Sequence, residues 1–293
     1  MLGAMAAFSF GDALMKLSTA HLPAGQAICI RGLIAMIFIW TLAVRSGALA
    51  EWRRLLHPHM PYRTLGDMGG SFFYICALPY MPLAEAAAIL QINPLVVTAA
   101  AAVFLGEQVG WRRWTATGIG FIGAMMIIQP GSASFTWASV LCLMAVLSAV
   151  TRDIATRKLV GVPTVLITML AVTATLIASL AFAAFETWIR PEIGDVIRLS
   201  AAALCMLAGQ MLVVTSIRAG DVSAVVPFRY SAILWTLLLS AAIWHYLPNA
   251  LTLAGIAVVA GAGLYTFFRE QTLRRNIVRM TAAAQAEIAV QPP

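Results

Sequence analysis

The sequence predicts an all-α membrane protein of ten transmembrane helices, arranged as two inverted repeats of five helices each. Composition is the first indication, because 61% of the residues are apolar and 11% are charged, whereas soluble domains are about 45–50% apolar. The second is a series of apolar runs near or above the ~18 residues typical of a membrane span. The third is that basic residues gather in alternate connections between these runs. The alternative, a large soluble all-α core, needs more polar surface than this chain has.

Ten apolar runs approach the ~20 residues that a spanning helix requires. They end at proline and glycine clusters, such as those at 80–82 and 129–131, where helices stop. The runs cover residues 3–20, 24–44, 64–80, 82–104, 114–129, 135–153, 162–185, 198–217, 222–243 and 250–268.

The basic residues indicate an orientation. If the N-terminus is inside, the inner connections carry most of the 19 Lys and Arg residues, whereas the outer segment 186–195 carries Glu186, Glu192 and Asp195. By the positive-inside rule, both termini are expected in the cytoplasm. The net charge of +7 is therefore spread along membrane boundaries, where it can meet anionic lipid. We expect the lipid bilayer as a partner and no nucleic acid, which would need one basic soluble face.

Two segments share one plan. Residues 77–126 and 216–265 each contain an apolar helix with an internal proline (Pro94 and Pro227), a short turn, and a Gly-rich helix. An odd number of helices per unit makes the second unit enter the membrane from the opposite side, as in transporters built from inverted repeats. Pro94 and Pro227 do not align when the turns do, so this repeat rests on the shared plan. The predicted units are 1–130 and 131–268, followed by a basic cytoplasmic tail, 269–293.

Charged residues inside the runs are expected to face the bundle interior, because lipid exposure costs about 2.5–3.5 kcal/mol even on a lenient scale. Asp12 and Lys16 are spaced to pair on one helix face; alternatively, Lys16 lines a pathway and meets a substrate carboxylate. Arg31 is expected to reach the outer headgroups or to brace the first helix. Asp12 and Glu85 are candidates for proton coupling, because buried carboxylates can titrate near neutral pH.

Polar residues also gather beside the two internal prolines. Proline removes a backbone donor and frees polar groups of the helix. A simple kink is the alternative, but two kinks in corresponding helices favour a binding site near the midplane. The candidate substrate-binding residues are Gln91 and Asn93 beside Pro94, Arg229 and Tyr230 beside Pro227, together with Lys16, Tyr74 and Gln210.

The sequence lacks the motifs of cofactor and nucleotide chemistry. It contains no Walker loop, no G-x-S-x-G, no H-E-x-x-H and no Rossmann glycine motif, and its four cysteines lack metal-ligand spacing. We therefore expect no cofactor and no metal, and transport that runs on gradients or exchange. A membrane-embedded enzyme is an alternative, but its only candidate carboxylate pair, Asp12 with Glu85, lies at different depths.

Several segments resemble EamA-type members of the drug/metabolite transporter superfamily. They are ALPYMPLAEAAAILQINP at 77–94 with FLGE at 104–107, IRGLIA at 30–35, VPFRYSAILW at 226–235 and GAGLY at 261–265. The likeness spans about residues 3–268. One departure is that residues 244–248 stand where an acidic residue like Glu107 is common.

The resemblance implies alternating-access transport of small metabolites across a bacterial inner membrane. It implies a central cavity formed mainly by helices 1, 3, 4, 6, 8 and 9. Amino-acid exporters of the YddG type, which include carriers of aromatic amino acids, are the most similar group, and nucleoside or S-adenosylmethionine carriers are alternatives. Lys16 or Arg229 would then meet the substrate carboxylate, and Gln91 and Asn93 its ammonium. We expect a monomer or a weak homodimer.

Overall fold

The computed structural model describes residues 1–105, 110–131, 136–159, 161–219 and 226–290. These residues form α-helices and short 3-10 helices (η) and no strand, which confirms the all-α prediction. The elements are α1 (Leu2–Thr19), α2 (Ala24–Arg45), η1 (Ala48–Leu56), α3 (Met60–Ala77), η2 (Leu78–Tyr80), α4 (Leu83–Leu90), α5 (Asn93–Leu105), α6 (Trp111–Ile128), α7 (Trp137–Arg157), α8 (Thr164–Ala183), α9 (Ile193–Ala219), η3 (Val226–Tyr230), α11 (Ser231–Trp244) and α12 (Ala250–Val290).

Six helical stretches among the described residues are long and apolar enough to cross a membrane. Each of the ten predicted runs overlaps at least one helix. The multi-pass membrane character is therefore confirmed, while the division into ten spans and two repeats stays a prediction. The six stretches are Ala24–Arg45, Leu83–Val103, Trp137–Thr156, Thr164–Ala183, Ile193–Val213 and Ala250–Arg269.

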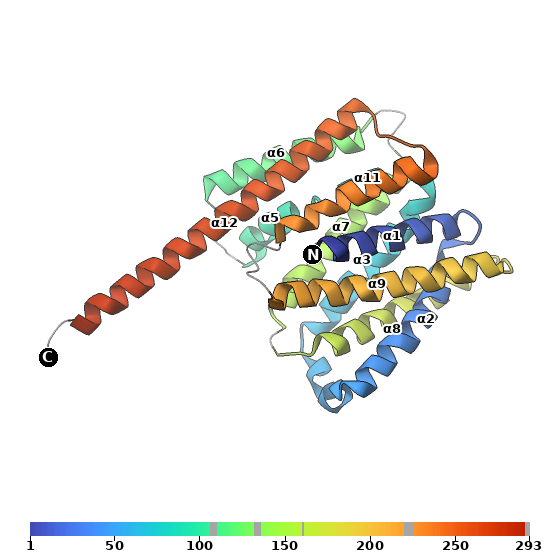
Figure 1. The fold of residues 1–293 in the computed structure, drawn as a ribbon, viewed down its shortest axis with the longest axis horizontal. Coiled ribbons are helices and arrows are strands. Elements are labelled where there is room, and N and C mark those ends of the chain that lie inside the picture. Colours follow the sequence, from blue (N-terminus) through green and yellow to red (C-terminus); the bar gives the residue numbers. More distant parts are fainter. Residues whose placement is uncertain (106–109, 132–135, 160, 220–225, 291–293) are drawn as a thin grey trace.

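The helices pack in matched pairs. In Figure 1, α6 and α12 lie side by side at one edge of the bundle, and α2 and α8 lie at the opposite edge. Between them, α1 packs on α9 and α3 packs on α7. Two further contacts also occur in matching form. The contact of α3 with α8 corresponds to that of α2 with α9, and the contact of α1 with α11 corresponds to that of α7 with α5. Exchanging the two predicted five-helix units would interchange these contacts.

Small residues allow the closest of these approaches. A Cβ atom built at Gly66 on α3 would lie 2.6 Å from the backbone nitrogen of Arg152 on α7. One built at Gly255 on α12 would lie 2.7 Å from the carbonyl oxygen of Gly123 on α6. These glycines therefore let helix backbones touch, as small residues do in membrane bundles. The close contact at Gly66 also brings Asp67 of α3 next to Arg152 of α7.

The predicted proline-containing helices are both irregular. The fourth run is divided into α4 and α5 at Gln91 and Ile92, directly before Asn93 and Pro94. Pro94 is the second residue of α5, where a missing backbone donor costs least. Pro227 lies in the short 3-10 helix η3, and α11 follows it from Ser231.

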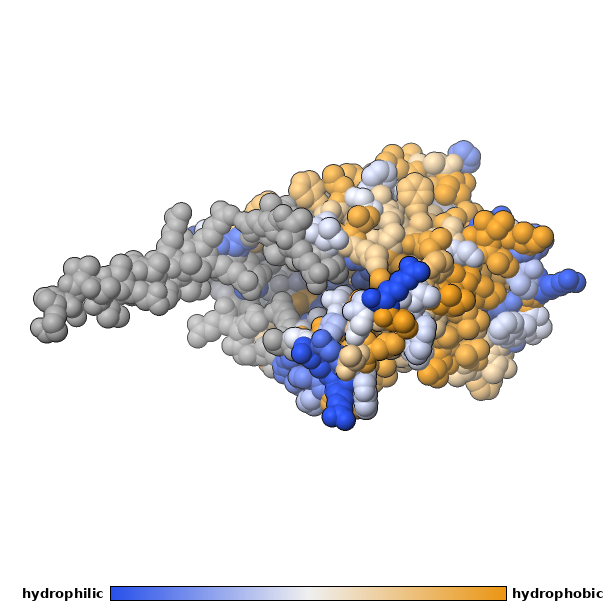
Figure 2. Space-filling model, turned by 60° about the horizontal axis from the view of Figure 1, so that its bottom comes forward, coloured by the Kyte–Doolittle hydropathy of each residue, from blue (hydrophilic) through white to orange (hydrophobic). Residues whose placement is uncertain are grey.

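The outer surface is rich in apolar side chains, as lipid contact requires. Ile37, Ile177 and Leu234 are more than 60% exposed. Figure 2 shows a broad hydrophobic area on one face of the molecule, with hydrophilic residues beside it. The last helix, α12, continues beyond the bundle through the segment predicted as a tail (Figure 1). Glu107 and part of the first predicted turn lie outside the described residues, whereas the second turn follows α11 at His245, whose φ is 49°.

Candidate functional site

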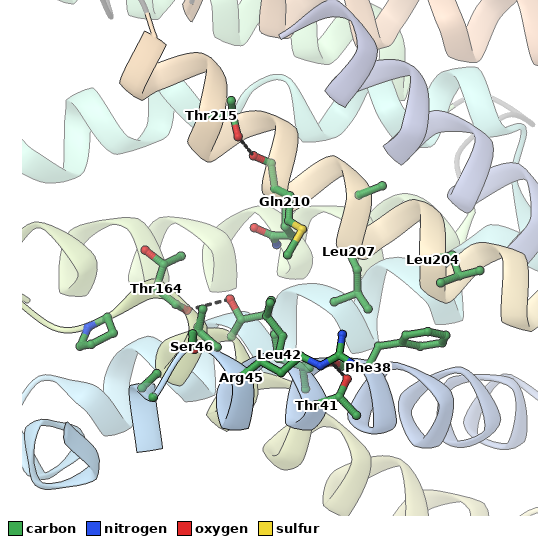
Figure 3. Close-up of a pocket in the computed structure, with 18 of the residues that line it drawn as sticks. Phe38, Thr41, Leu42, Arg45, Ser46, Thr164, Leu204, Leu207, Gln210 and Thr215 are labelled. Carbon is green, nitrogen blue, oxygen red and sulfur yellow. Dashed lines mark hydrogen bonds between the residues drawn. The ribbon is translucent and has the colours of Figure 1, made fainter. Parts of the chain in front are cut away.

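A central cavity of about 190 Å³ lies inside the bundle, between α1, α2, α3, α7, α8 and α9. Charged and polar residues from all of these helices line it, among them Asp12, Arg31, Asp67, Tyr74, Arg152, Thr168 and Gln210. Gln210 also lines a larger groove on the outside of the bundle (Figure 3). Of the residues predicted for the site, the central cavity thus contains Asp12, Tyr74 and Gln210.

Asp12 is held by groups from two other helices. The Tyr74 hydroxyl donates a hydrogen bond to Oδ2 of Asp12 at 3.1 Å, and Arg31 interacts with the carboxylate electrostatically. A buried charge is costly unless it is paired and hydrogen-bonded, and Tyr74 and Arg31 meet both needs. Of the two predictions for Arg31, the outer headgroups or bracing of the first helix, its place in this cavity beside Asp12 of α1 agrees with the second.

The ammonium of Lys16 is held by backbone carbonyls of the turn between α3 and α4. Its ammonium donates to the carbonyl oxygens of Leu78 at 2.5 Å and Met81 at 2.6 Å, and lies 5.6 Å from the ring centroid of Trp244. The expected ion pair with Asp12 is not among the ion pairs of the described residues, although the spacing permits it. Lys16 instead ties α1 to the turn between α3 and α4, because tertiary contacts outcompete the local pair.

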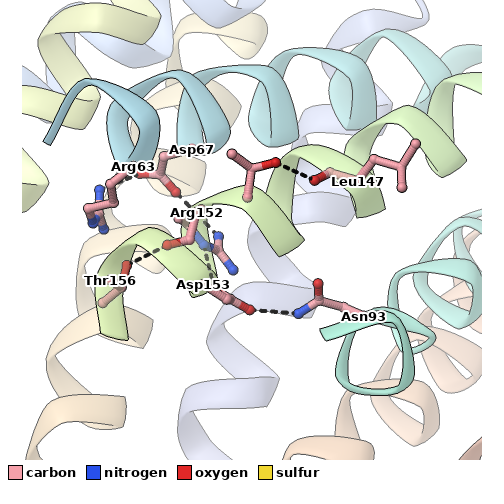
Figure 4. A network of polar contacts seen from close by, with 8 residues as sticks. Arg63, Asp67, Asn93, Leu147, Arg152, Asp153 and Thr156 are labelled. Atoms are coloured by element: carbon pink, nitrogen blue, oxygen red, sulfur yellow. Dashed lines mark hydrogen bonds and ion pairs between the residues drawn. The ribbon is translucent and has the colours of Figure 1, made fainter. Parts of the chain in front are cut away.

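A chain of polar contacts connects α3, α7 and α5 (Figure 4). Arg63 Nη1 lies 3.5 Å from Asp67 Oδ2, and Arg152 Nη1 lies 3.3 Å from Asp67 Oδ1. The Nε group of Arg152 donates to Asp153 Oδ1 at 2.9 Å, and Asn93 Nδ2 donates to Asp153 Oδ2 at 2.8 Å. One continuous network therefore runs from the first turn of α3 to the helix break before Pro94.

A second cavity of about 250 Å³ lies at the far end of this network. Its lining includes Gln91, Asn93, Asp153, Arg229 and Tyr230. Gln91 Nε2 donates to the carbonyl oxygen of Arg229 at 3.1 Å, which joins the two proline-containing segments. Asn93 Oδ1 and the Tyr230 hydroxyl are buried without a hydrogen-bond partner among the described residues. Such groups are available to a ligand or water.

The two cavities are lined by adjacent residues of α7. Arg152 lines the central cavity and Asp153 lines the second. The count of basic residues placed Arg152 in an inner loop. For Asp67 the only signal in the sequence was its spacing from Arg63, and for Asp153 it was the adjacent opposite charge of Arg152 at the end of an apolar run. These residues were therefore missed as site candidates.

Glu85 lies in neither cavity. It accepts a hydrogen bond from the Tyr246 hydroxyl after α11. Burial, together with the nearby carboxylate, raises the pKa of Tyr246 above its usual range, so this phenol stays a donor. Pro94 lines the second cavity, whereas Pro227 is not among the residues lining either one. Among the described residues, no three His, Cys, Asp or Glu side chains are placed to hold a metal ion.

Comparison with known proteins identifies similar transporters. Residues 1–129 match the model of the EamA-like transporter family. The chain is 26% identical over 277 residues to a riboflavin transporter of Rhizobium johnstonii, covering 86% of this chain and 91% of that protein. It is 26% identical over 272 residues to the pseudopaline exporter CntI of Pseudomonas aeruginosa, covering 89% and 93%. It is 24% identical over 271 residues to an S-adenosylmethionine uptake transporter of Rickettsia prowazekii, covering 90% and 89%.

A solved crystal structure shares the fold. It is 18% identical to this chain, with a TM-score of 0.64, and the match covers 93% of this chain and 97% of that one. Together, the matches make the chain similar to small-molecule transporters, and its residues 1–129 similar to the EamA-like family. They do not support the narrower prediction of a YddG-type amino-acid exporter, since the named relatives carry other substrate names.

Proposed function

We propose that this chain is a secondary transporter of the bacterial inner membrane that moves small metabolites bearing both an ammonium and a carboxylate group. The central cavity carries this proposal, because its lining holds two acids, Asp12 and Asp67, and two bases, Arg31 and Arg152. An uncompensated charge in such a site is strongly unfavourable. A zwitterion adds no net charge and offers a partner to each sign.

In this proposal, Asp12, oriented by Tyr74, meets the substrate ammonium, and Arg31 or Arg152 meets its carboxylate. Lys16 is less suited to the carboxylate than the sequence suggested, because its ammonium already donates to two backbone carbonyls. The second cavity provides a further polar binding region for the substrate during transport. It is lined by Gln91, Asn93, Arg229 and Tyr230.

The size of the central cavity favours a small substrate. Its volume of about 190 Å³ lies below the roughly 300–1,000 Å³ of pockets for drug-sized ligands. Amino acids are therefore the first candidates, as the sequence suggested. Larger metabolites, such as the riboflavin or S-adenosylmethionine named for the relatives, are the alternative and would require the cavity to widen.

Alternating access is supported by the matched helix contacts, which are those expected of two inverted five-helix units. The family match to residues 1–129 ends beside the predicted boundary at 130. With the N-terminus in the cytoplasm, the contacts of Lys16 close the outer end of α1, and the Arg63-to-Asn93 network closes the inner side. Opening one set while the other remains closed would expose the central cavity to each side in turn.

The test is transport by the purified full-length chain in liposomes without ATP. A panel of labelled zwitterionic amino acids, S-adenosylmethionine and riboflavin should include at least one compound that enters faster than into protein-free liposomes. Uptake of riboflavin alone would contradict the zwitterion requirement. Chemical conversion of a panel compound by the protein in detergent would instead support the membrane-embedded enzyme.

A further inference from the structure

A large groove on the outside of the bundle has no role in the proposed transport cycle. It has a volume of about 820 Å³ and lies between α2, η1, α8 and α9. Its walls are mainly apolar and include Phe38, Leu42, Leu204 and Leu207 (Figure 3). Phe38 and Leu204 are more than 40% exposed, so the groove opens to the surroundings of the bundle, which in a membrane protein are lipid chains.

A positive charge lies at one end of this groove. Arg45 is the last residue of α2, is exposed, and has no ion-pair partner among the described residues. The neighbouring acid, Glu51, is engaged with Arg54 at 3.0 Å. The predicted topology places Arg45 at the cytoplasmic boundary of the membrane, where anionic headgroups attract basic side chains. The groove therefore combines an apolar channel with an unpaired cation at headgroup depth.

One wall of the groove is shared with the central cavity. Gln210 and Thr168 line both the groove and the cavity. The Thr168 hydroxyl donates to the carbonyl oxygen of Thr164, whereas the amide of Gln210 is exposed and has no hydrogen-bond partner among the described residues. An occupant of the groove would therefore lie against a wall that the transport cavity also uses.

We propose that this groove binds one anionic phospholipid, with its phosphate at Arg45 and an acyl chain along α2 and α9. The apolar walls match the chain, because an acyl chain that leaves the equally apolar bilayer core keeps its apolar surroundings and gains van der Waals packing against the groove. The guanidinium matches the phosphate, because arginine recognises phosphate oxygens through a planar set of donors. A zwitterionic phospholipid fits the walls equally well, but its positive headgroup lies near Arg45 and weakens the match.

Native mass spectrometry of the full-length chain tests this proposal. The protein is released from nanodiscs containing equal amounts of phosphatidylglycerol and phosphatidylcholine, and the lipids that remain bound are counted. The wild-type chain should retain one phosphatidylglycerol at least tenfold more often than one phosphatidylcholine. Arg45→Ala should remove this preference. The matched control is Arg53→Ala, because Arg53 is a neighbouring basic residue that does not line the groove, and it should keep the preference.

A second variant probes the apolar wall. Leu207→Trp fills the groove and should reduce retention of both lipids at least tenfold. Size-exclusion chromatography verifies that each variant remains folded, and the comparison of the two lipids on the wild-type chain does not depend on any variant. Equal retention of the two lipids by the wild-type chain would overturn the proposal, as would identical behaviour of Arg45→Ala and Arg53→Ala.

Discussion

The guanidinium of Arg152 lies 3.3 Å from the carboxylate of Asp67, and this ion pair joins α7 to α3 inside the bundle. The two residues are 85 positions apart in the chain and belong to different predicted repeats. Arg152 also contacts Asp153, which accepts a hydrogen bond from Asn93. A single side chain therefore connects the central cavity to the helix break before Pro94.

Replacing Arg152 by alanine should destabilise the protein. The side chains of Arg152 and Asp67 are 30% and 22% exposed, so loss of the cation leaves the partly buried Asp153 without its ion pair and Asp67 with Arg63 as its remaining cation. We expect the free energy of unfolding to fall by about 1–3 kcal/mol, between the values for exposed and fully buried pairs. Denaturant unfolding in detergent measures this change.

The control for that experiment is Arg54→Ala. Arg54 pairs with Glu51 on the surface, where the two side chains are 53% and 45% exposed, and such pairs contribute about 0–1 kcal/mol. Equal losses in the two variants would show that the Arg152 network does not stabilise the bundle.

Tyr74→Phe should weaken substrate binding without unfolding the protein. The change removes only the hydroxyl that donates to Asp12, and a hydrogen bond to a charged group contributes about 1.5–3 kcal/mol. We expect the substrate concentration for half-maximal transport to rise roughly tenfold or more, because 1.4 kcal/mol corresponds to a factor of ten. Tyr80→Phe is the matched control, since Tyr80 is 74% exposed. Unchanged transport in Tyr74→Phe would remove Tyr74 and Asp12 from the proposed binding site.

Lys16→Met should open the outer end of the bundle. The variant loses both hydrogen bonds to the turn between α3 and α4. Cys142 reports on this region, because its Sγ lies 3.4 Å from the sulfur of Met81 and is buried. In a chain with Cys142 as its only cysteine, a membrane-impermeant maleimide should label the variant faster than the parent.

Lys158→Met provides the comparison, since Lys158 follows α7 at the opposite end and is exposed. A Lys16→Met variant that loses transport but labels at the parental rate would instead support the original prediction, that Lys16 binds the substrate carboxylate.

The bond between Tyr246 and Glu85 should be insensitive to ionisation of the phenol over the physiological range. The pKa of Tyr246 is raised by burial and by the carboxylate, above the usual value of about 10. The resulting stabilisation is complete below pH 10 and is lost only as the pH rises toward the higher folded-state pKa. Tyr246→Phe should therefore lower the unfolding temperature by the same amount at pH 7 and pH 9. A loss that shrinks over this interval would contradict the assignment.

The helices could be predicted from sequence because a span needs a continuous apolar run, and each run from 3–20 to 250–268 overlaps a helix. The side-chain contacts between helices could not be predicted in this way. Asp12 and Lys16 have suitable spacing, yet Tyr74 holds one and backbone carbonyls hold the other. Asp153 was missed for a related reason, since its partner Asn93 is distant in the chain and only the packing of α5 on α7 brings them together.

Counterflow in proteoliposomes tests the central claim most directly. Vesicles loaded with an unlabelled zwitterionic amino acid and diluted into the labelled compound should accumulate label transiently, without ATP, when they contain the full-length chain. Asp12→Asn should reduce this accumulation at least tenfold, because the proposed partner of the substrate ammonium is then neutral. Accumulation that is identical in the Asp12→Asn variant, or absent for every zwitterion tried, would contradict the account.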